Sequence, residues 1–452
     1  MRYIIRLLLL SVMTQLVLSG SATGPAQARQ FSFIRDAEIE DTIRLFGTPL
    51  FAVAGLEPSS VRVYLVNDPS LNAFVAGGQR IFINTGLLIA SQNANEVIGV
   101  LAHETGHISG GHLARSRDAL SDASAQSIMA MVLGVVAAVA GAPGVGQAIA
   151  AGGTHIAQRS YLKYSRVQES SADQAALTML DETHQTSRGM LTFFEQLGDQ
   201  EALLTASQDP YVRTHPLTRD RVDTIRAHVE KSPYADTIEL ALYVERHDRM
   251  RAKLIAFIGS PAATYRKYPG NSVPARYARS IARHKQRQTD KALALIQGLI
   301  AEYPEDPYFH ELHGQILLES GNAEAAVAPY EAAVALRPNK VLLRLGLGQA
   351  QVSVEDDRYI QAAIDNMGRA VRLAPGNASA WRWLGMAYGR KGDIGQASLA
   401  TAERYYLTGK YRDAVGQAAR AEHVLAKGTP GWLRAQDLKV ASEQKMKRKR
   451  RR

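Results

Sequence analysis

The carboxy-terminal part of the chain contains a repeated sequence pattern, and this pattern limits the folds that it can adopt. Pro304 and Pro338 are 34 residues apart, and Pro375 follows 37 residues later. Other landmarks keep the same register in two copies: Gly314, Gly321 and Ala326 recur as Gly385, Gly392 and Ala397. A period of this length is typical of a helix pair, which cannot bury its apolar face without a neighbour. We therefore expect the pairs to stack into an α-solenoid.

One copy carries a more specific signature. Its pattern W-x2-L-G-x2-Y is the start of a tetratricopeptide repeat (TPR), and the matching residues are Trp381, Leu384, Gly385 and Tyr388. The preceding copy, 339–375, is three residues longer, and the following copy is irregular. We expect a TPR-like repeat domain over 273–440, which connecting helices over 233–272 link to the rest of the chain.

The first 28 residues have the layout of a secretory signal peptide. Arg2 and Arg6 precede an apolar run over 7–18, and a stretch of small residues ends at Ala28. The apolar run is shorter than the roughly 20 residues that a membrane-spanning helix needs. We expect cleavage after Ala28 and export to a bacterial periplasm, with an uncleaved anchor as the alternative.

Composition excludes several classes of function. The formal charge is +10, but the last eight residues alone carry seven basic groups and no acidic one. The remaining chain is close to neutral, so we expect no nucleic-acid partner. Cysteine is absent, which excludes cysteine nucleophiles, disulfides and thiolate zinc sites. The basic end, 441–452, is typical of a solvated tail, with contact to an anionic membrane surface or an acidic partner as alternatives.

Residues 29–232 show the pattern of a mainly helical α+β domain with a small sheet. Hydrophobic periodicity and turn residues predict strands over 61–66, 72–75 and 79–84. They predict helices over 36–46, 93–118, 161–181 and 188–197, a loop over 199–216, and a last helix around Ile225. The uncharged segment 128–142 is short for a membrane span. It is a buried helix, a segment touching the membrane surface, or a true span.

His103, Glu104 and His107 form an H-E-x-x-H motif inside the long helix predicted over 93–118. Residues four apart lie on one helix face, so the two imidazoles can hold one zinc ion. Glu104 then lies where its carboxylate can take a proton from a metal-bound water. The motif predicts hydrolysis at one Zn2+ per chain. The alternative is a helix with two surface histidines.

A catalytic zinc ion requires a third protein ligand from another element. Glu169 and Asp173 are four apart on a predicted helix. Glu169 could bind the metal while Asp173 hydrogen-bonds a ligand histidine. Other acids and the histidines His112, His155 and His184 remain alternative ligands.

The order of these motifs resembles the HtpX/BepA-type zinc metallopeptidases. The shared motifs are HETGH followed by His112, E-x-x-A-D at 169–173, and Thr214-His215-Pro216 with Arg221 beyond. The signal peptide and the carboxy-terminal repeats are similar to the periplasmic BepA branch. The resemblance implies a gluzincin-like zinc metallopeptidase domain over 29–232. Its implied zinc ligands are His103, His107 and Glu169, with Glu104 as the base and Asp173 supporting a ligand.

The resemblance also implies a regulatory histidine. His215, on the predicted loop, would occupy the fourth metal position and hold the enzyme idle; a turn role is the alternative. Arg221 would stabilise the developing oxyanion, orient substrate or form a structural salt bridge. The strand at Asn72, Ala73 and Phe74 could pair with an extended substrate through main-chain hydrogen bonds, or serve only as scaffold.

The combined prediction is a periplasmic zinc endopeptidase with a chaperone-like role in envelope quality control. The resemblance implies misfolded or stalled outer-membrane proteins as substrates. It implies that the TPR repeats dock the β-barrel assembly machinery, with the protein free in the periplasm or peripheral to the membrane. One alternative is a non-proteolytic TPR chaperone or adaptor with a closed zinc site. Another is an integral membrane protease.

Overall fold

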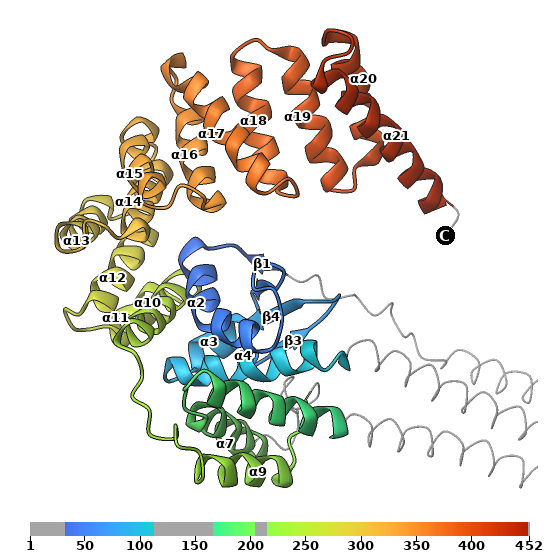
Figure 1. Cartoon of the computed structure of the whole chain (residues 1–452). Coiled ribbons are helices and arrows are strands. Elements are labelled where there is room, and N and C mark those ends of the chain that lie inside the picture. The colour runs from blue at the N-terminus through green and yellow to red at the C-terminus, as the bar shows by residue number, and fades with distance from the viewer. Residues whose placement is uncertain (1–31, 113–165, 204–214, 451–452) are drawn as a thin grey trace, which may run out of the picture.

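The computed structural model describes residues 32–112, 166–203 and 215–450 (Figure 1). The signal peptide predicted over 1–28, the apolar segment 128–142 and His155 lie outside these ranges. The described chain is mainly helical with one small sheet, which confirms the predicted fold class. Among the helices described, none is both long and apolar enough to span a membrane.

The described sheet has four strands in the order β1-β2-β4-β3. Their bounds are Phe33–Ile34, Arg62–Val66, Ala73–Val75 and Arg80–Asn84 for β1 to β4. β2 and β4 are parallel, and the two outer pairs are antiparallel. Three of the strands were predicted, whereas β1 has only two residues and is too short to show alternation. Because β3 is the last strand in this order, it lies at an edge of the sheet.

The helix that carries H-E-x-x-H is α4, Ala94–Ser109. Asn93 caps it by accepting a hydrogen bond from the Glu96 backbone N–H at 3.0 Å. The Glu96 side chain accepts from the Gln92 N–H at 2.8 Å, one residue before the partner that a capping box uses. The expected continuation to residue 118 is wrong. Gly111 follows the helix end with φ of 63°, a conformation that suits glycine and turns the chain.

Four further helical segments surround α4. They are α2 (Ala37–Val53), the helix over residues 166–182, α7 (Arg188–Leu203) and α9 (Arg219–Val229). α2 continues past the expected end at 46 because Leu50 and Phe51 are buried in the core. α7 likewise extends into the expected loop. A short helix, α3 (Thr85–Ala90), was not predicted. In Figure 1, α4 lies between the sheet and α2 on one side and α7 and α9 on the other.

The chain then passes through α10 (Ala241–Ile258) and α11 (Pro261–Lys267) into stacked helix pairs. The pairs are α12 (Val273–Lys285) with α13 (Thr289–Glu302), α14 (Pro307–Glu319) with α15 (Ala323–Leu336), α16 (Val341–Ser353) with α17 (Ile360–Leu373), α18 (Ala378–Arg390) with α19 (Ile394–Leu407), and α20 (Tyr411–Val424) with α21 (Pro430–Arg450). The extra residues of the long copy contain the short 3-10 turn Asp357–Tyr359. Figure 1 shows the pairs forming an arc beside the sheet-containing part. The predicted tail is helical as far as Arg450, because α21 continues into it.

Helix α2 joins the two parts of the molecule. Its buried Glu38 accepts a hydrogen bond from the Tyr277 hydroxyl of α12 at 2.7 Å and pairs with Arg249 of α10 at 2.6 Å. The Tyr308 hydroxyl of α14 donates to Asp41 of α2 at 2.5 Å. The repeats are therefore attached directly to the helix that packs on α4.

Candidate metal centre

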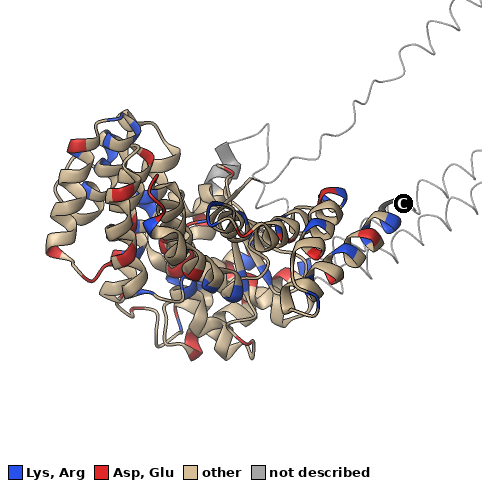
Figure 2. Ribbon diagram, turned by 90° about the horizontal axis from the view of Figure 1, so that it is seen from above, with Lys and Arg blue, Asp and Glu red and all other residues tan. Residues whose placement is uncertain are grey.

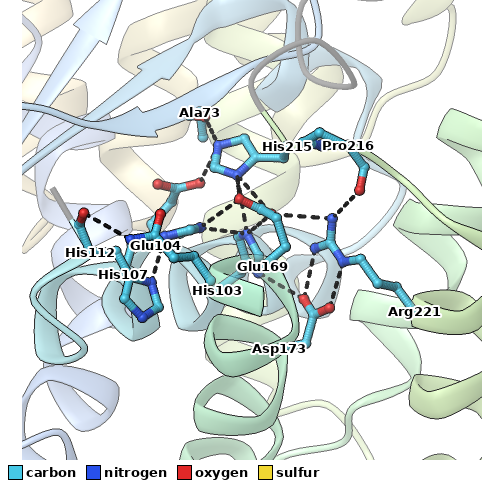
Figure 3. Close-up of polar contacts among 11 residues, drawn as sticks. Ala73, His103, Glu104, His107, His112, Glu169, Asp173, His215, Pro216 and Arg221 are labelled. Atoms are coloured by element: carbon cyan, nitrogen blue, oxygen red, sulfur yellow. Dashed lines mark hydrogen bonds and ion pairs between the residues drawn. The ribbon is translucent and has the colours of Figure 1, made fainter. Parts of the chain in front are cut away.

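Four side chains from three separate segments meet at one point beside α4 (Figure 3). His103 and His107 come from α4, Glu169 from the helix over 166–182, and His215 from the residues before α9. One potential ligand atom of each lies within 4.8 Å of all the others. The segments are far apart in sequence, so only the fold brings these groups together.

The close approach of the two ligand-bearing helices depends on a glycine. A Cβ added to Gly106 of α4 would lie 2.7 Å from the backbone oxygen of Ala172. Ala172 is fully buried one turn after Glu169. A larger residue at position 106 would push the helices apart and withdraw the Glu169 carboxylate from the histidines.

The ligand atoms have the spacing of a tetrahedral zinc site. His103 Nε2 lies 3.1 Å from His107 Nε2 and 3.3 Å from His215 Nδ1. Glu169 places its carboxylate oxygens 3.3 Å from His103 Nε2 and 3.4 Å from His107 Nε2. Four ligand atoms at ~2.0–2.1 Å from a tetrahedral centre would be ~3.3 Å apart. The three imidazoles and one carboxylate therefore fit a zinc ion.

Glu104 lies beside this group, and neither of its carboxylate oxygens has a hydrogen-bond partner among the described residues. Its side chain is fully buried, and its Oε1 is 3.4 Å from His215 Nε2. A buried carboxylate without hydrogen bonds costs free energy, so such groups mark a place where water or a ligand binds. This position suits a base that acts on a water molecule at the metal.

Asp173, in contrast, is fully paired. Its carboxylate accepts two hydrogen bonds from Arg221, at 2.6 and 2.8 Å, and its Oδ1 lies 2.9 Å from His103 Nδ1. Burial acts to raise the pKa of Asp173, but Arg221 and His103 hold that pKa below its usual value. Asp173 therefore stays ionised and orients the His103 ring through Nδ1, the nitrogen that faces away from the other ligand atoms.

Arg221 also donates to the backbone oxygen of Pro216 at 2.8 Å and lies 3.2 Å from Glu169. Of the roles open to it from the sequence, these contacts favour the structural salt bridge. It anchors the segment that carries His215.

His215 reaches both the ligand group and the sheet edge. Its Nδ1 is 3.2 Å from Glu169, while its Nε2 lies 3.2 Å from the backbone oxygen of Ala73 in β3. Phe74 points its ring onto Phe82 of β4, with 5.0 Å between ring centroids. Asn72, just before β3, is buried. The predicted substrate strand is thus an edge strand beside the candidate metal centre, and its Ala73 carbonyl faces His215.

Comparison with known proteins agrees with this geometry. Residues 36–229 match the model of peptidase family M48, and residues 277–341 match a tetratricopeptide repeat model. The chain carries an M48 metallopeptidase domain followed by TPR repeats. The "Beta-barrel assembly-enhancing protease" of Yersinia pestis is 26% identical over 394 residues, which cover 85% of this chain and 79% of that protein. The protein of the same name in Escherichia coli (strain K12) is 24% identical over 407 residues, covering 88% and 81%.

The pKa values in the M48 site reflect both burial and the pairing of carboxylates with histidines. Burial acts to lower the pKa of His103, but hydrogen bonds to Asp173 and Glu169 raise it to about 9. Burial lowers the pKa of His107. The pKa of Glu169 is far below its usual value because His215 and the other two histidines outweigh the effect of burial. The Glu169 carboxylate therefore stays ionised, as a metal ligand requires.

The two alternative histidines within the described residues, His112 and His184, lie outside the ligand group. His184 stacks on Tyr234, with 4.6 Å between ring centroids, and is not part of the ligand group. His112 contacts the far side of His107 instead of the common point, with 3.0 Å between the two Nδ1 atoms. The sequence interpretation missed this contact. The signal available was a histidine five residues after His107, across the glycine pair Gly110-Gly111.

Proposed function

We propose that this metallopeptidase is a zinc-dependent endopeptidase of the periplasm that acts on misfolded or stalled outer-membrane proteins. The observation that carries the chemistry is the meeting of His103, His107 and Glu169 beside the buried carboxylate of Glu104, which has no hydrogen-bond partner among the described residues. Three such ligands are typical of a catalytic zinc site, whose fourth position is open to water. The layout of residues 1–28 supports export.

In this proposal each residue has a separate task. His103, His107 and Glu169 hold the zinc ion, which when bound supplies a Lewis acid that polarises water and the scissile carbonyl. Glu104 accepts a proton from the attacking water on a carboxylate oxygen and then donates it to the leaving amine. Asp173 and Arg221 keep His103 in place.

Substrate binding is proposed along β3. An extended polypeptide could add to this sheet edge through main-chain hydrogen bonds, and the Ala73 carbonyl would accept one of them. Recognition through the backbone tolerates many sequences. That tolerance suits an enzyme for misfolded proteins, whose segments are extended and exposed.

His215 is the proposed inhibitory element. Its Nδ1 takes the place of a fourth ligand, and its Nε2 faces the Ala73 carbonyl that a substrate would use. One side chain thus obstructs both the metal position and the substrate edge. The same observation favours the second candidate function, a TPR chaperone or adaptor whose site stays closed.

The named relatives support a role in β-barrel assembly. We propose that the arc of repeats docks the β-barrel assembly machinery, since solenoids offer extended concave surfaces. Lys445, Lys447 and Arg448 are exposed near the end of α21. Figure 2 shows basic residues, in blue, on the helix that ends at the carboxy terminus. They support an additional contact with an anionic membrane surface.

The experiment that tests the proposal compares cleavage of an unfolded outer-membrane protein by purified variants. Glu104→Gln should lower the cleavage rate at least ~100-fold, while the zinc content stays at one ion per chain. The control is Glu182→Gln, an exposed acid at the end of the helix that carries Glu169. Cleavage by Glu104→Gln at the parental rate would contradict the mechanism.

The same assay separates the two candidate functions. His215→Ala should raise the rate, because it frees the fourth position and the Ala73 carbonyl. An unchanged or lower rate would remove the inhibitory role. If neither the parent nor His215→Ala cleaves while both bind zinc, the adaptor function is the better description.

A further inference from the structure

Each ligand histidine of α4 has one ring nitrogen for the metal and one for a supporting partner. The Nε2 atoms of His103 and His107 face the common point, 3.1 Å apart (Figure 3). His103 Nδ1 faces Asp173, as already described. His107 Nδ1 faces the Nδ1 of His112 at 3.0 Å. A carboxylate, a backbone carbonyl or water is the usual partner at this position, so an imidazole partner requires explanation.

Metal binding determines the protons in this histidine pair. To bind through Nε2, His107 must be neutral and must carry its proton on Nδ1. His107 Nδ1–H then donates to His112 Nδ1, which has to accept. The proton of His112 therefore lies on its Nε2. Only an acceptor at the position of His112 Nδ1 can hold the His107 ring in the tautomer that binds metal.

The local backbone is built to place His112 there. α4 ends at Ser109, and Gly111, whose φ of 63° suits glycine, redirects the chain just before His112. A Cβ added to Gly110 would lie 2.4 Å from His112 Nε2, so the ring fits only against a glycine. His112 is 4% exposed in this position.

His112 also connects the two ligand-bearing helices. Its backbone oxygen accepts a hydrogen bond from the Gln168 side chain at 3.1 Å. Gln168 immediately precedes Glu169 on the other helix. The side chain of His112 therefore contacts one ligand, while its backbone is bonded to the neighbour of another.

We infer that His112 is a positioning residue of the metal centre, which orients the His107 imidazole and ties the helix of Glu169 to it. The inference rests on the metal role of His107 in the proposed function. Loss of a supporting partner of this kind typically lowers metal affinity ~10–100-fold. The zinc affinity of the protein should therefore depend on an acceptor at position 112.

The test measures the zinc dissociation constant of the full chain by competition with a chelator. His112→Phe keeps a planar ring but removes the acceptor, and should weaken zinc binding ~10–100-fold. His112→Asn can place its Oδ1 near the position of Nδ1, and should retain most of the affinity. Circular dichroism and thermal unfolding establish that each variant is folded.

Gly110→Ala provides a second route, because its new methyl group displaces the His112 ring without changing that residue. It should weaken zinc binding in the same direction as His112→Phe, and it serves in place of that variant if His112→Phe does not fold. Parental affinity in folded His112→Phe or in Gly110→Ala, or equal losses in His112→Phe and His112→Asn, would overturn the inference. A parent chain that binds no zinc would instead contradict the proposed function.

Discussion

Glu104 and Asp173 are both buried carboxylates close to a histidine ring, but they differ in their hydrogen bonds. Glu104 has no hydrogen-bond partner among the described residues, whereas Asp173 accepts two from Arg221 and contacts His103. The carboxylate without hydrogen bonds destabilises the fold but is available to take part in the reaction. The paired group stabilises both the fold and the metal ligand. A substitution of Glu104 should therefore raise stability while abolishing activity, whereas a substitution of Asp173 should lower both.

This distinction gives a prediction for Arg221. Arg221→Met should lower the free energy of unfolding by about 3–5 kcal/mol, because it leaves Asp173 buried without its cation. It should also weaken zinc binding, since Asp173 would no longer hold His103. Urea unfolding measures the first effect.

The matched control is Arg226→Met on the same helix. The ion pairs of Arg226 with Glu195 and Asp223 are exposed, so this substitution should barely change the free energy of unfolding. If the two variants are equally stable, the buried pair does not have the role given to it.

At the scale of helices and strands, the sequence predicted those elements whose own residues show a cap, a helical period or strand alternation. Asn93 and the apolar periodicity located α4, and alternation located β2 and β4. The end of α4 was misplaced because a turn at Gly111 depends on its positive φ, which periodicity does not reveal. β1 exists only as a two-residue pairing with β2.

The metal centre shows the same division. Spacing on one helix was enough to pair His103 with His107 and Glu169 with Asp173. The pairing of Asp173 with Arg221 joins residues far apart in sequence, and only the resemblance suggested that they belong to one site. The contact between His107 and His112 depends on a turn, so it could be found only in the folded chain.

The repeats yield a prediction about two glycines that the sequence alone cannot distinguish. A Cβ on Gly314 in α14 would lie 2.7 Å from the Tyr330 ring of α15, whereas a Cβ on Gly298 in α13 would meet nothing within 4 Å. Gly314→Ala should lower the free energy of unfolding by about 1–3 kcal/mol through overpacking. Gly298→Ala should raise it by roughly 0.5–1 kcal/mol because alanine favours the helix. Chemical denaturation of the two variants tests this, and effects of the same sign would show that Gly314 is not a packing requirement.

At the scale of the whole molecule, a cluster of charges lies where α2 meets the repeats. Lys253 of α10 is 2.8 Å from Asp36 and 3.3 Å from Glu38 at the start of α2, and 3.7 Å from Glu311 of α14. Arg249 adds a second cation, which pairs with Glu38 and with Asp306. The attachment of the repeats to the peptidase part therefore depends on ionisable groups and should depend on pH.

Glu311 is the group in this cluster that changes its charge in an accessible range. Burial raises its pKa to about 8, because the attraction of Lys253 is smaller than the cost of burial and the repulsion from Asp36 and Glu38. The usual pKa of a glutamate is ~4.3, so between these values the folded chain binds a proton that the unfolded chain does not. The free energy of unfolding should therefore fall as pH rises from about 5 to about 8.

Glu311→Gln keeps the shape of the side chain but cannot ionise. It should therefore flatten this pH dependence and be more stable than the parent at pH 8. Chemical denaturation at pH 5.5 and pH 8 measures how the free energy of unfolding of each protein changes with pH. An equal change in parent and variant would show that Glu311 ionises normally at the interface.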